Sequence, residues 1–194
     1  ERNRWILEHK RPSWVGEFGA LFDGPVNSPT NADKARLLAL KDQLEIFNKH
    51  EQHWTIWTYK DVGVQGLVIP KEDREYMKRI RPIFELKKKL GLDPWTSRGY
   101  GLLRGETARM VETIAQAVSE IVKDYSLDYT SLTRELGDRL LSGAISSFLA
   151  PLYAFQFMDM TEEEIEKMHH MAFEFSNCEK RLYLIEVLES ALKN

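Results

Sequence analysis

The sequence has a single cysteine, Cys178, among its 194 residues. One cysteine cannot form an internal disulfide, and no ligands stand around it at the spacing of a zinc site. No apolar run is long enough to cross a bilayer. The net charge is only −3 and no long basic run occurs, so we expect neither nucleic acid nor membrane as a partner. What remains is a globular chain long enough to bury a core.

The first residues, ERNRWILEHKRPSW, lack both an initiating Met and the form of a secretory signal peptide. They read as the end of a helix that Pro12 terminates. We therefore expect this chain to be a portion of a longer protein.

Residues 1 to about 92 mix strand and helix patterns. The patterns predict strands over 13–18 and 53–59, and helices over 32–48, starting after Asn31, and 73–90, with Pro82 inside. Alternation of strand and helix implies parallel strands covered by helices. Two such repeats are too few for a stable sheet, and an eight-fold barrel needs about 250 residues.

Residues 93–194 read as almost wholly helical. We predict helices over 104–125, from residue 130 or 131 to about 149, after a capping box formed by Thr161 and Glu164, and after Asn177. This part is expected to be a small bundle or a sheath packed on the first part.

A lone carboxylate, Glu17, ends the first predicted strand, with glycines beside it at 16 and 19. Alternation places Glu17 on the same face as Val15, and Trp57 on the same face as Thr55 in the second strand. If the two strands are neighbours in a barrel, Glu17 and Trp57 lie at the rim where barrel enzymes keep catalytic groups. A carboxylate beside a flat indole suits the binding of a sugar ring.

The stretch WVGEFGALF (14–22), followed by HWTIWTYKDVGVQGLV (53–68), resembles glycoside hydrolase family 5, the cellulase family. The match is to the seventh and eighth βα units of its (β/α)8 barrel. REYMKRIRPIFELKKKLG (74–91) is similar to the helix that closes such barrels, and the tail to a helical extension of some members. The resemblance implies an α/β fold: the C-terminal portion of a TIM barrel in residues 1–92, then a mostly helical extension in 93–194.

The same resemblance implies that Glu17 is the nucleophile of a retaining mechanism. Trp57 would line the sugar site, and Lys60 and Asp61 would hydrogen-bond sugar hydroxyls. The expected substrate is a β-glucan or another β-linked oligosaccharide, and no cofactor or metal is needed.

One expected motif is missing, because the family's acid/base glutamate follows an Asn in an Asn-Glu-Pro type motif that these residues lack. The proton donor is therefore expected from the remaining N-terminal barrel units of the same protein, and the fragment alone should be nearly inert. Two alternatives stay open. The chain could be a non-catalytic carbohydrate-binding or interaction protein with a helical docking domain, and Glu17, Lys60 and Asp61 could be solvated surface residues.

Overall fold

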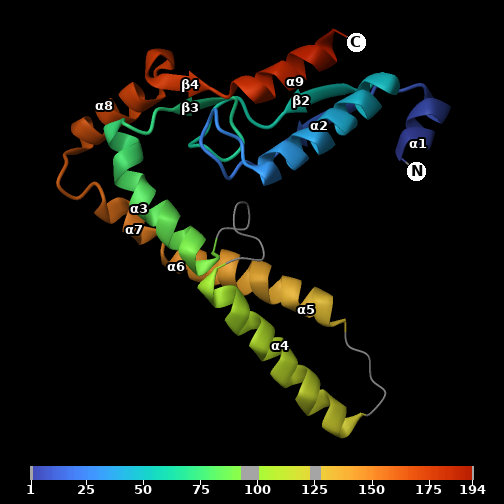
Figure 1. Ribbon diagram of the computed structural model, residues 1–194, viewed down its shortest axis with the longest axis vertical. Coiled ribbons are helices and arrows are strands. Elements are labelled where there is room, and N and C mark those ends of the chain that lie inside the picture. The colour runs from blue at the N-terminus through green and yellow to red at the C-terminus, as the bar shows by residue number, and fades with distance from the viewer. Residues whose placement is uncertain (1, 93–100, 123–127, 194) are drawn as a thin grey trace. The chain divides into compact units, whose positions relative to one another are not determined.

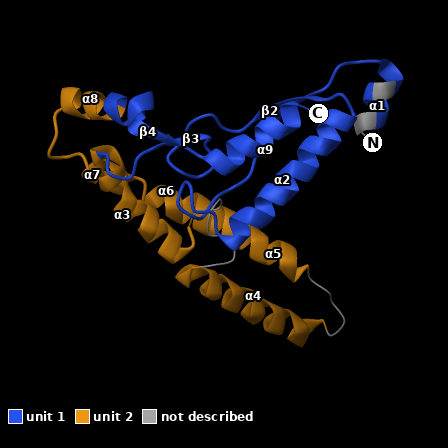
Figure 2. Ribbon diagram, turned by 45° about the horizontal axis from the view of Figure 1, so that its top comes forward, with its two compact units in different colours: residues 1–74, 170–194 blue, residues 75–169 orange. Residues whose placement is uncertain are grey.

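The computed structural model describes residues 2–92, 101–122 and 128–193 (Figure 1). These residues form two compact units, which Figure 2 shows in different colours: unit 1 is residues 1–74 and 170–194, and unit 2 is residues 75–169. In chain order, unit 1 contains α1 (Arg2–His9), β1 (Trp14–Phe18), α2 (Asn31–Lys49), β2 (His53–Ile56), β3 (Val68–Pro70), the 3₁₀ turn η2 (Phe175–Asn177), β4 (Cys178–Lys180) and α9 (Leu182–Leu192). Unit 2 contains α3 (Glu75–Leu90), α4 (Leu102–Ile121), α5 (Tyr129–Glu135), the π-helical η1 (Leu136–Ile145), α6 (Ser146–Phe148) and α7 (Pro151–Phe155), and α8 (Glu162–Phe173) begins in it and ends in unit 1.

The two units do not follow the expected division at residue 92. Helix α3 groups with the helices that come after it, and residues 170–194 group with the first 74 residues. The reason is packing, because β4 pairs with β3 and α9 packs on α2. A division by composition along the chain cannot find a segment that returns to an earlier part.

Strands β1 and β2 lie side by side and are parallel, as the strand–helix–strand order predicted. Their residues are rich in aromatic and β-branched types, which favour strands. The register pairs Trp14 with His53, Val15 with Trp54 and Phe18 with Ile56.

An irregularity in β1 separates residues that simple alternation would put together. The register shifts between Val15 and Phe18. Trp14, which is 70% exposed, donates a hydrogen bond from its indole N–H to the Thr55 hydroxyl at 2.7 Å. Phe18 instead packs its ring edge-on against Phe47 of α2, with centroids 5.0 Å apart. Trp14 and Phe18 are four positions apart, so regular alternation would put them on the same face of the strand. The bulge places them on opposite faces.

Helix α2 begins one residue earlier than the sequence indicated, and its N-cap is Thr30 rather than Asn31. The Thr30 hydroxyl accepts from the backbone N–H of Asp33, and the Asp33 carboxylate accepts from the backbone N–H of Thr30. This reciprocal pair is a capping box, with Asp at the position that Glu or Gln more often occupies.

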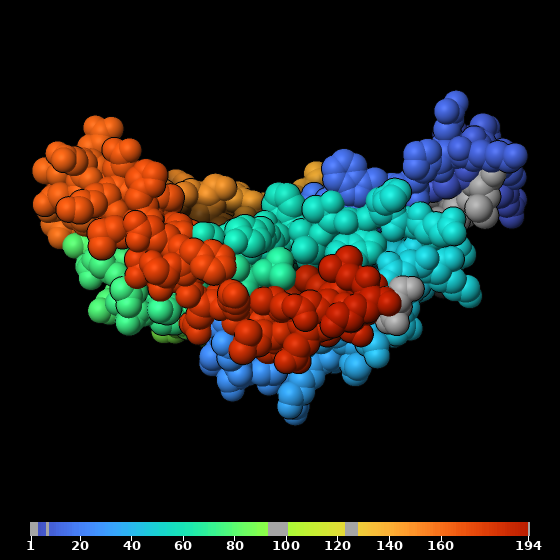
Figure 3. Space-filling view, turned by 90° about the horizontal axis from the view of Figure 1, so that it is seen from above, coloured from blue at the N-terminus to red at the C-terminus, as the bar shows by residue number. Residues whose placement is uncertain are grey.

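The core of unit 1 lies between α2 and α9, with the segment after β1. Its buried residues are Ala20, Phe22, Leu40, Leu44, Leu184 and Leu188. Figure 3 shows the surface of α9, coloured red, beside the cyan surface of α2 and β2. Trp54 packs against this core and donates its indole N–H to the Asn48 side chain at 3.1 Å.

The prediction that Asn177 caps the last helix is wrong. Residues 178–180 form β4, which pairs antiparallel with β3, and α9 starts only at Leu182 with Arg181 at its N-cap. Asn177 accepts a hydrogen bond from Arg74 and donates one to the carbonyl of Met171. The sequence missed β3 and β4 because strands of three residues carry too little pattern.

Unit 2 is helical. Its core includes the buried face of α3, Met77, Ile80 and Ile83, together with Val111 of α4 and Leu141 of η1. Pro82 lies inside α3, as expected. The capping box at the start of α8 is confirmed, since the Thr161 hydroxyl accepts from the Glu164 N–H and the Glu164 carboxylate accepts from the Thr161 N–H.

An ion pair joins α3 to the turn after α7 within unit 2. The Arg79 guanidinium donates to both carboxylate oxygens of Asp159, at 2.6 and 3.0 Å, and to Glu75. These hydrogen bonds, first of all those to Asp159, raise the pKa of Arg79.

In the part of the chain that the structure describes, no helix is both long and apolar enough to cross a membrane.

Candidate functional site

The ends of β1 and β2 bring Glu17 and Trp57 close to each other. The backbone N–H of Trp57 donates to the carbonyl of Phe18, the residue after Glu17, at 2.8 Å. Glu17 is exposed and Trp57 is 49% exposed. Residues along β2 alternate, with His53, Thr55 and Trp57 exposed and the residues between them half-buried. We conclude that Trp57 points to the face of this two-stranded sheet opposite the packed Phe18 ring.

The bulge in β1 decides the orientation of Glu17. The register pairs Val15 with Trp54, which packs on the core, so strict alternation would have sent Glu17 toward the core. Glu17 instead is exposed and directly precedes Phe18, whose ring packs on α2. Glu17 therefore does not share a face with Val15, as alternation had predicted. It lies on the exposed face of the sheet, where Trp57 also lies.

A glycine is required where the two strand ends meet. A Cβ built on Gly19 would overlap the carbonyl oxygen of Trp57. The peptide bond that follows Trp57 is cis. Gly19 thus allows the backbone after Glu17 to approach the backbone of Trp57 directly.

The carboxylate of Glu17 makes no hydrogen bond or ion pair with any residue that the structure describes. Glu17 is an exposed residue, so its carboxylate is accessible to a ligand. A carboxylate with such access can accept hydrogen bonds from hydroxyls or attack an electrophilic carbon. It needs further groups to position it, and this chain's described residues supply none.

Lys60 follows Trp57 in the loop after β2 and is held by a distant segment. Its ammonium donates to the carbonyl of Phe173 at 2.6 Å. The same nitrogen lies 6.0 Å from the ring centroid of Tyr59 and 6.0 Å from that of Phe175. The Lys60 ammonium is therefore held by a main-chain carbonyl and lies near two aromatic rings, so Lys60 is more than a solvated loop residue.

Asp61 shapes its own loop. One carboxylate oxygen accepts from the N–H of Gly63 at 2.8 Å and the other from the N–H of Gln65 at 2.6 Å. A Cβ on Gly66 would lie 2.7 Å from the Asp61 side chain, so the turn closes tightly on it. Hydrogen bonding to sugar hydroxyls by Lys60 and Asp61 stays a prediction, and each side chain also has a structural partner.

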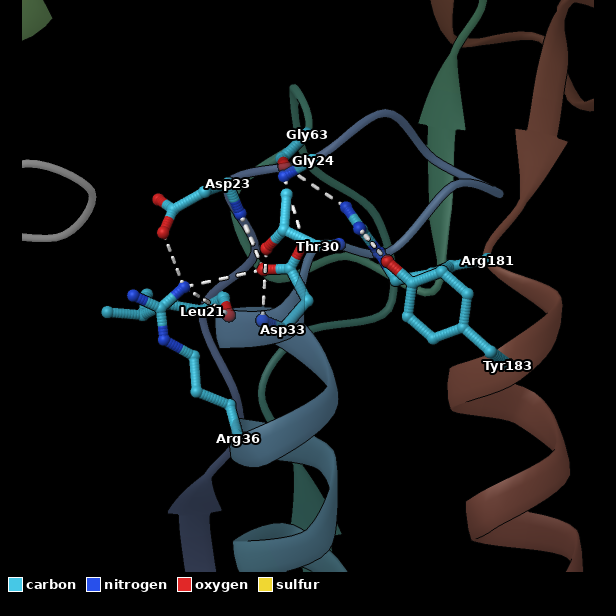
Figure 4. Close-up of polar contacts among 9 residues, drawn as sticks. All are labelled: Leu21, Asp23, Gly24, Thr30, Asp33, Arg36, Gly63, Arg181 and Tyr183. Atoms are coloured by element: carbon cyan, nitrogen blue, oxygen red, sulfur yellow. Dashed lines mark hydrogen bonds and ion pairs between the residues drawn. The ribbon is translucent and has the colours of Figure 1, made fainter.

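Two buried charged residues, Asp33 and Arg181, support this region, and sequence reasoning did not single them out (Figure 4). The Arg181 guanidinium donates to the carbonyls of Gly66 and Gly63, at 3.1 and 3.0 Å, and lies 4.1 Å from the ring centroid of Phe22. Phe22 in turn donates its backbone N–H to the carbonyl of Val64. The loops after β1 and β2 are thus tied to each other and to the C-terminal segment.

Asp33 organises the loop that leads into α2. Its carboxylate accepts from the backbone N–H groups of Asp23, Gly24 and Thr30, at 2.8, 3.0 and 2.9 Å. Burial raises the pKa of Asp33, but these hydrogen bonds to the charged form outweigh it, and the net pKa is lowered. The spacing from Thr30 to Asp33 is the signal that could have found it in the sequence.

No group of three or more His, Cys, Asp or Glu side chains that could hold a metal occurs in residues 2–92, 101–122 and 128–193. A groove of about 410 Å³ lies between α2 and α9, lined by residues such as Lys41, Asn48 and Val187. Its lining includes neither Glu17 nor Trp57.

Comparison with known proteins gives one informative similarity. The chain is 30% identical, over an alignment 194 residues long, to a protein of Phanerodontia chrysosporium described as "Beta-xylosidase". The alignment covers 97% of this chain and 40% of that protein, so the chain spans less than half the length of the relative that it matches. No family model matches the chain, and no solved structure matches it.

Proposed function

We propose that this chain is the C-terminal part of a glycoside hydrolase that cleaves β-linked sugars, with Glu17 as its nucleophile. The observation that carries the proposal is the parallel pairing of β1 and β2, whose ends bring the exposed Glu17 beside the exposed Trp57. The similarity to a β-xylosidase along nearly the whole chain supports the class of reaction. The alternation of strand and helix, with α2 between β1 and β2, is consistent with the last two units of a (β/α)8 barrel of the family 5 type.

The proposed mechanism is a double displacement with retention. The Glu17 carboxylate attacks the anomeric carbon and forms an ester with the sugar, while the bond to the leaving oxygen breaks and that oxygen takes a proton from a second carboxylic acid. Water then attacks the anomeric carbon, the second carboxylate accepts the water proton, and the Glu17 carboxylate is released. Trp57 offers its indole face to the sugar ring during both steps.

The second carboxylic acid is proposed to come from a part of the protein outside these residues. In a retaining enzyme it must lie about 5 Å from the nucleophile. Other barrel strands would pair with the outer edges of β1 and β2, which among the described residues form a sheet of these two strands alone. These strands would also supply the groups that orient Glu17.

The name of the relative makes β-xylosides the first substrates to test, with β-glucosides and longer β-glucans next. A site of this type works without cofactor or metal, since both steps are carboxylate chemistry.

The test uses the intact protein and its Glu17→Gln variant. We expect Glu17→Gln to lower kcat on aryl β-xylosides or aryl β-glucosides by roughly 10³-fold or more, because the amide cannot form the ester. Glu45→Gln is the matched control, as Glu45 is an exposed glutamate of α2 and its side chain is 66% exposed. A 2-deoxy-2-fluoro glycoside should attach to the peptide that contains Glu17, which mass spectrometry detects.

Turnover of Glu17→Gln equal to that of the wild type would refute the assignment of the nucleophile. A wild-type protein that binds xylo-oligosaccharides and cleaves no β-glycoside would instead favour a carbohydrate-binding role.

A further inference from the structure

The segment that follows α8 is fixed against the loop that follows β2. The Lys60 ammonium donates to the carbonyl of Phe173, and the N–H of Lys71 donates to the carbonyl of Asn177 at 3.0 Å. The N–H of Arg181 donates to the carbonyl of Leu67 at 2.8 Å, and β4 pairs with β3 between these points. Residues 173–181 are therefore held in place by backbone and side-chain hydrogen bonds, all within unit 1.

This docking brings two exposed aromatic rings near one ammonium. Tyr59 is 59% exposed and Phe175 is 53% exposed, and each ring centroid lies 6.0 Å from the Lys60 nitrogen. The ammonium nitrogen of Lys180 lies 5.5 Å from the ring centroid of Phe175. Single exposed aromatic residues are common on protein surfaces. Two rings from segments more than a hundred residues apart, both near a lysine that a main-chain carbonyl anchors, form an ordered surface.

We propose that Tyr59, Lys60 and Phe175 form a sugar-binding subsite next to Trp57, which takes a further unit of a β-linked oligosaccharide. The inference rests on the proposed function and extends it to the substrate's length. Tyr59 is two residues after Trp57, so their Cα atoms are at most about 7 Å apart. The next unit of a sugar chain bound at Trp57 is therefore within reach of this surface under the proposal.

The chemistry of the three side chains matches a neutral sugar unit. Ring faces pack against the C–H groups of a pyranose, and an ammonium donates to its hydroxyls. A lysine has three N–H donors, and one of those of Lys60 is given to Phe173. The anchored ammonium loses little side-chain entropy when it binds, which favours recognition at this position.

The experiment compares kinetics on short and long substrates in the intact protein. The variants are Phe175→Ala and Tyr59→Ala, with Phe175→Tyr as the conservative variant. Substrates are an aryl β-xyloside, which has one sugar, and unbranched xylo-oligosaccharides of increasing length. Phe155→Ala is the control, because Phe155 is an aromatic residue of similar exposure, 58%, in unit 2.

We expect Phe175→Ala to raise the ratio of KM for the longer oligosaccharides to KM for the aryl xyloside by about tenfold, which is about 1.4 kcal/mol. Phe175→Tyr should restore the wild-type ratio, and Phe155→Ala should not change it. A ring that only stabilised the fold would alter both KM values together and leave their ratio unchanged.

An unchanged ratio in an active Phe175→Ala variant would overturn the subsite and leave the proposed function standing. A wild-type protein that cleaves none of these substrates would refute the proposed function itself, and the subsite with it.

Discussion

Replacing Arg181 by methionine should weaken unit 1 more than an ordinary surface change does. Arg181 is fully buried, and its guanidinium donates to the carbonyls of Gly63 and Gly66 and to the Tyr183 hydroxyl at 2.6 Å. It also lies over the Phe22 ring. Methionine keeps much of the apolar stem and can still cover Phe22, but it can donate no hydrogen bond.

The expected cost is about 2–4 kcal/mol of unfolding free energy. Each buried acceptor left without its hydrogen bond costs about 1–3 kcal/mol, and two main-chain carbonyls lose theirs. Removing a buried charge recovers part of this cost, because the guanidinium no longer has to be taken out of water. The groups left behind are neutral, so the loss stays below that of a stranded buried charge. Arg181→Lys should cost less, since an ammonium can still reach one acceptor.

Guanidinium chloride unfolding followed by tryptophan fluorescence is the assay. Trp5, Trp14, Trp54 and Trp57 all lie in unit 1, so the signal reports this unit strongly. Arg11→Met is the matched control, because Arg11 is an exposed residue of unit 1 and its replacement should change the stability by less than about 0.5 kcal/mol.

A loss of less than about 0.5 kcal/mol for Arg181→Met would refute this reasoning. Such a result would mean that the carbonyls of Gly63 and Gly66 find other donors when the guanidinium is removed. The tie between the loop after β2 and the C-terminal segment would then rest on backbone pairing alone.

Two further predictions concern the loops beside Glu17. Gly19→Ala should destabilise unit 1 by about 2 kcal/mol or more, because its Cβ would overlap the Trp57 carbonyl. Gly16→Ala is the control and should be tolerated, because no atom lies within 4 Å of the new Cβ. Equal melting temperatures of the two variants would contradict the close approach of Gly19 to Trp57. Asp33→Asn should lower stability at pH 7 by about 1–3 kcal/mol, since an amide oxygen cannot replace a carboxylate that accepts three backbone hydrogen bonds. The pKa of Asp33 is lowered in the folded state from its ordinary 3.8, so its stabilisation is complete above that value and is lost as the pH falls through the lowered pKa. Denaturation of both proteins between pH 7 and pH 2 measures this, and a difference that stays constant would refute it.

Local sequence patterns predicted the elements of unit 1 that position the candidate site. Aromatic and β-branched residues predicted β1 and β2, and the helix between them predicted that they are parallel. The Thr161–Glu164 capping box could also be predicted from the sequence, because both partners lie within one turn of the chain. Strand ends were less certain, and β2 stops at Ile56 where the pattern extended to Tyr59.

The sequence by itself determined what depends on neighbours along the chain: strands β1 and β2 and most helices. The order strand, helix, strand also predicted that β1 and β2 are parallel neighbours. Only the tertiary structure decided the face that Glu17 occupies, because the bulge in β1 arises from pairing with β2. The same holds for β4, Arg181 and Phe175, whose partners lie more than a hundred residues away. Contacts at that separation are fixed by the packing of the whole unit, and no local pattern of residues encodes them.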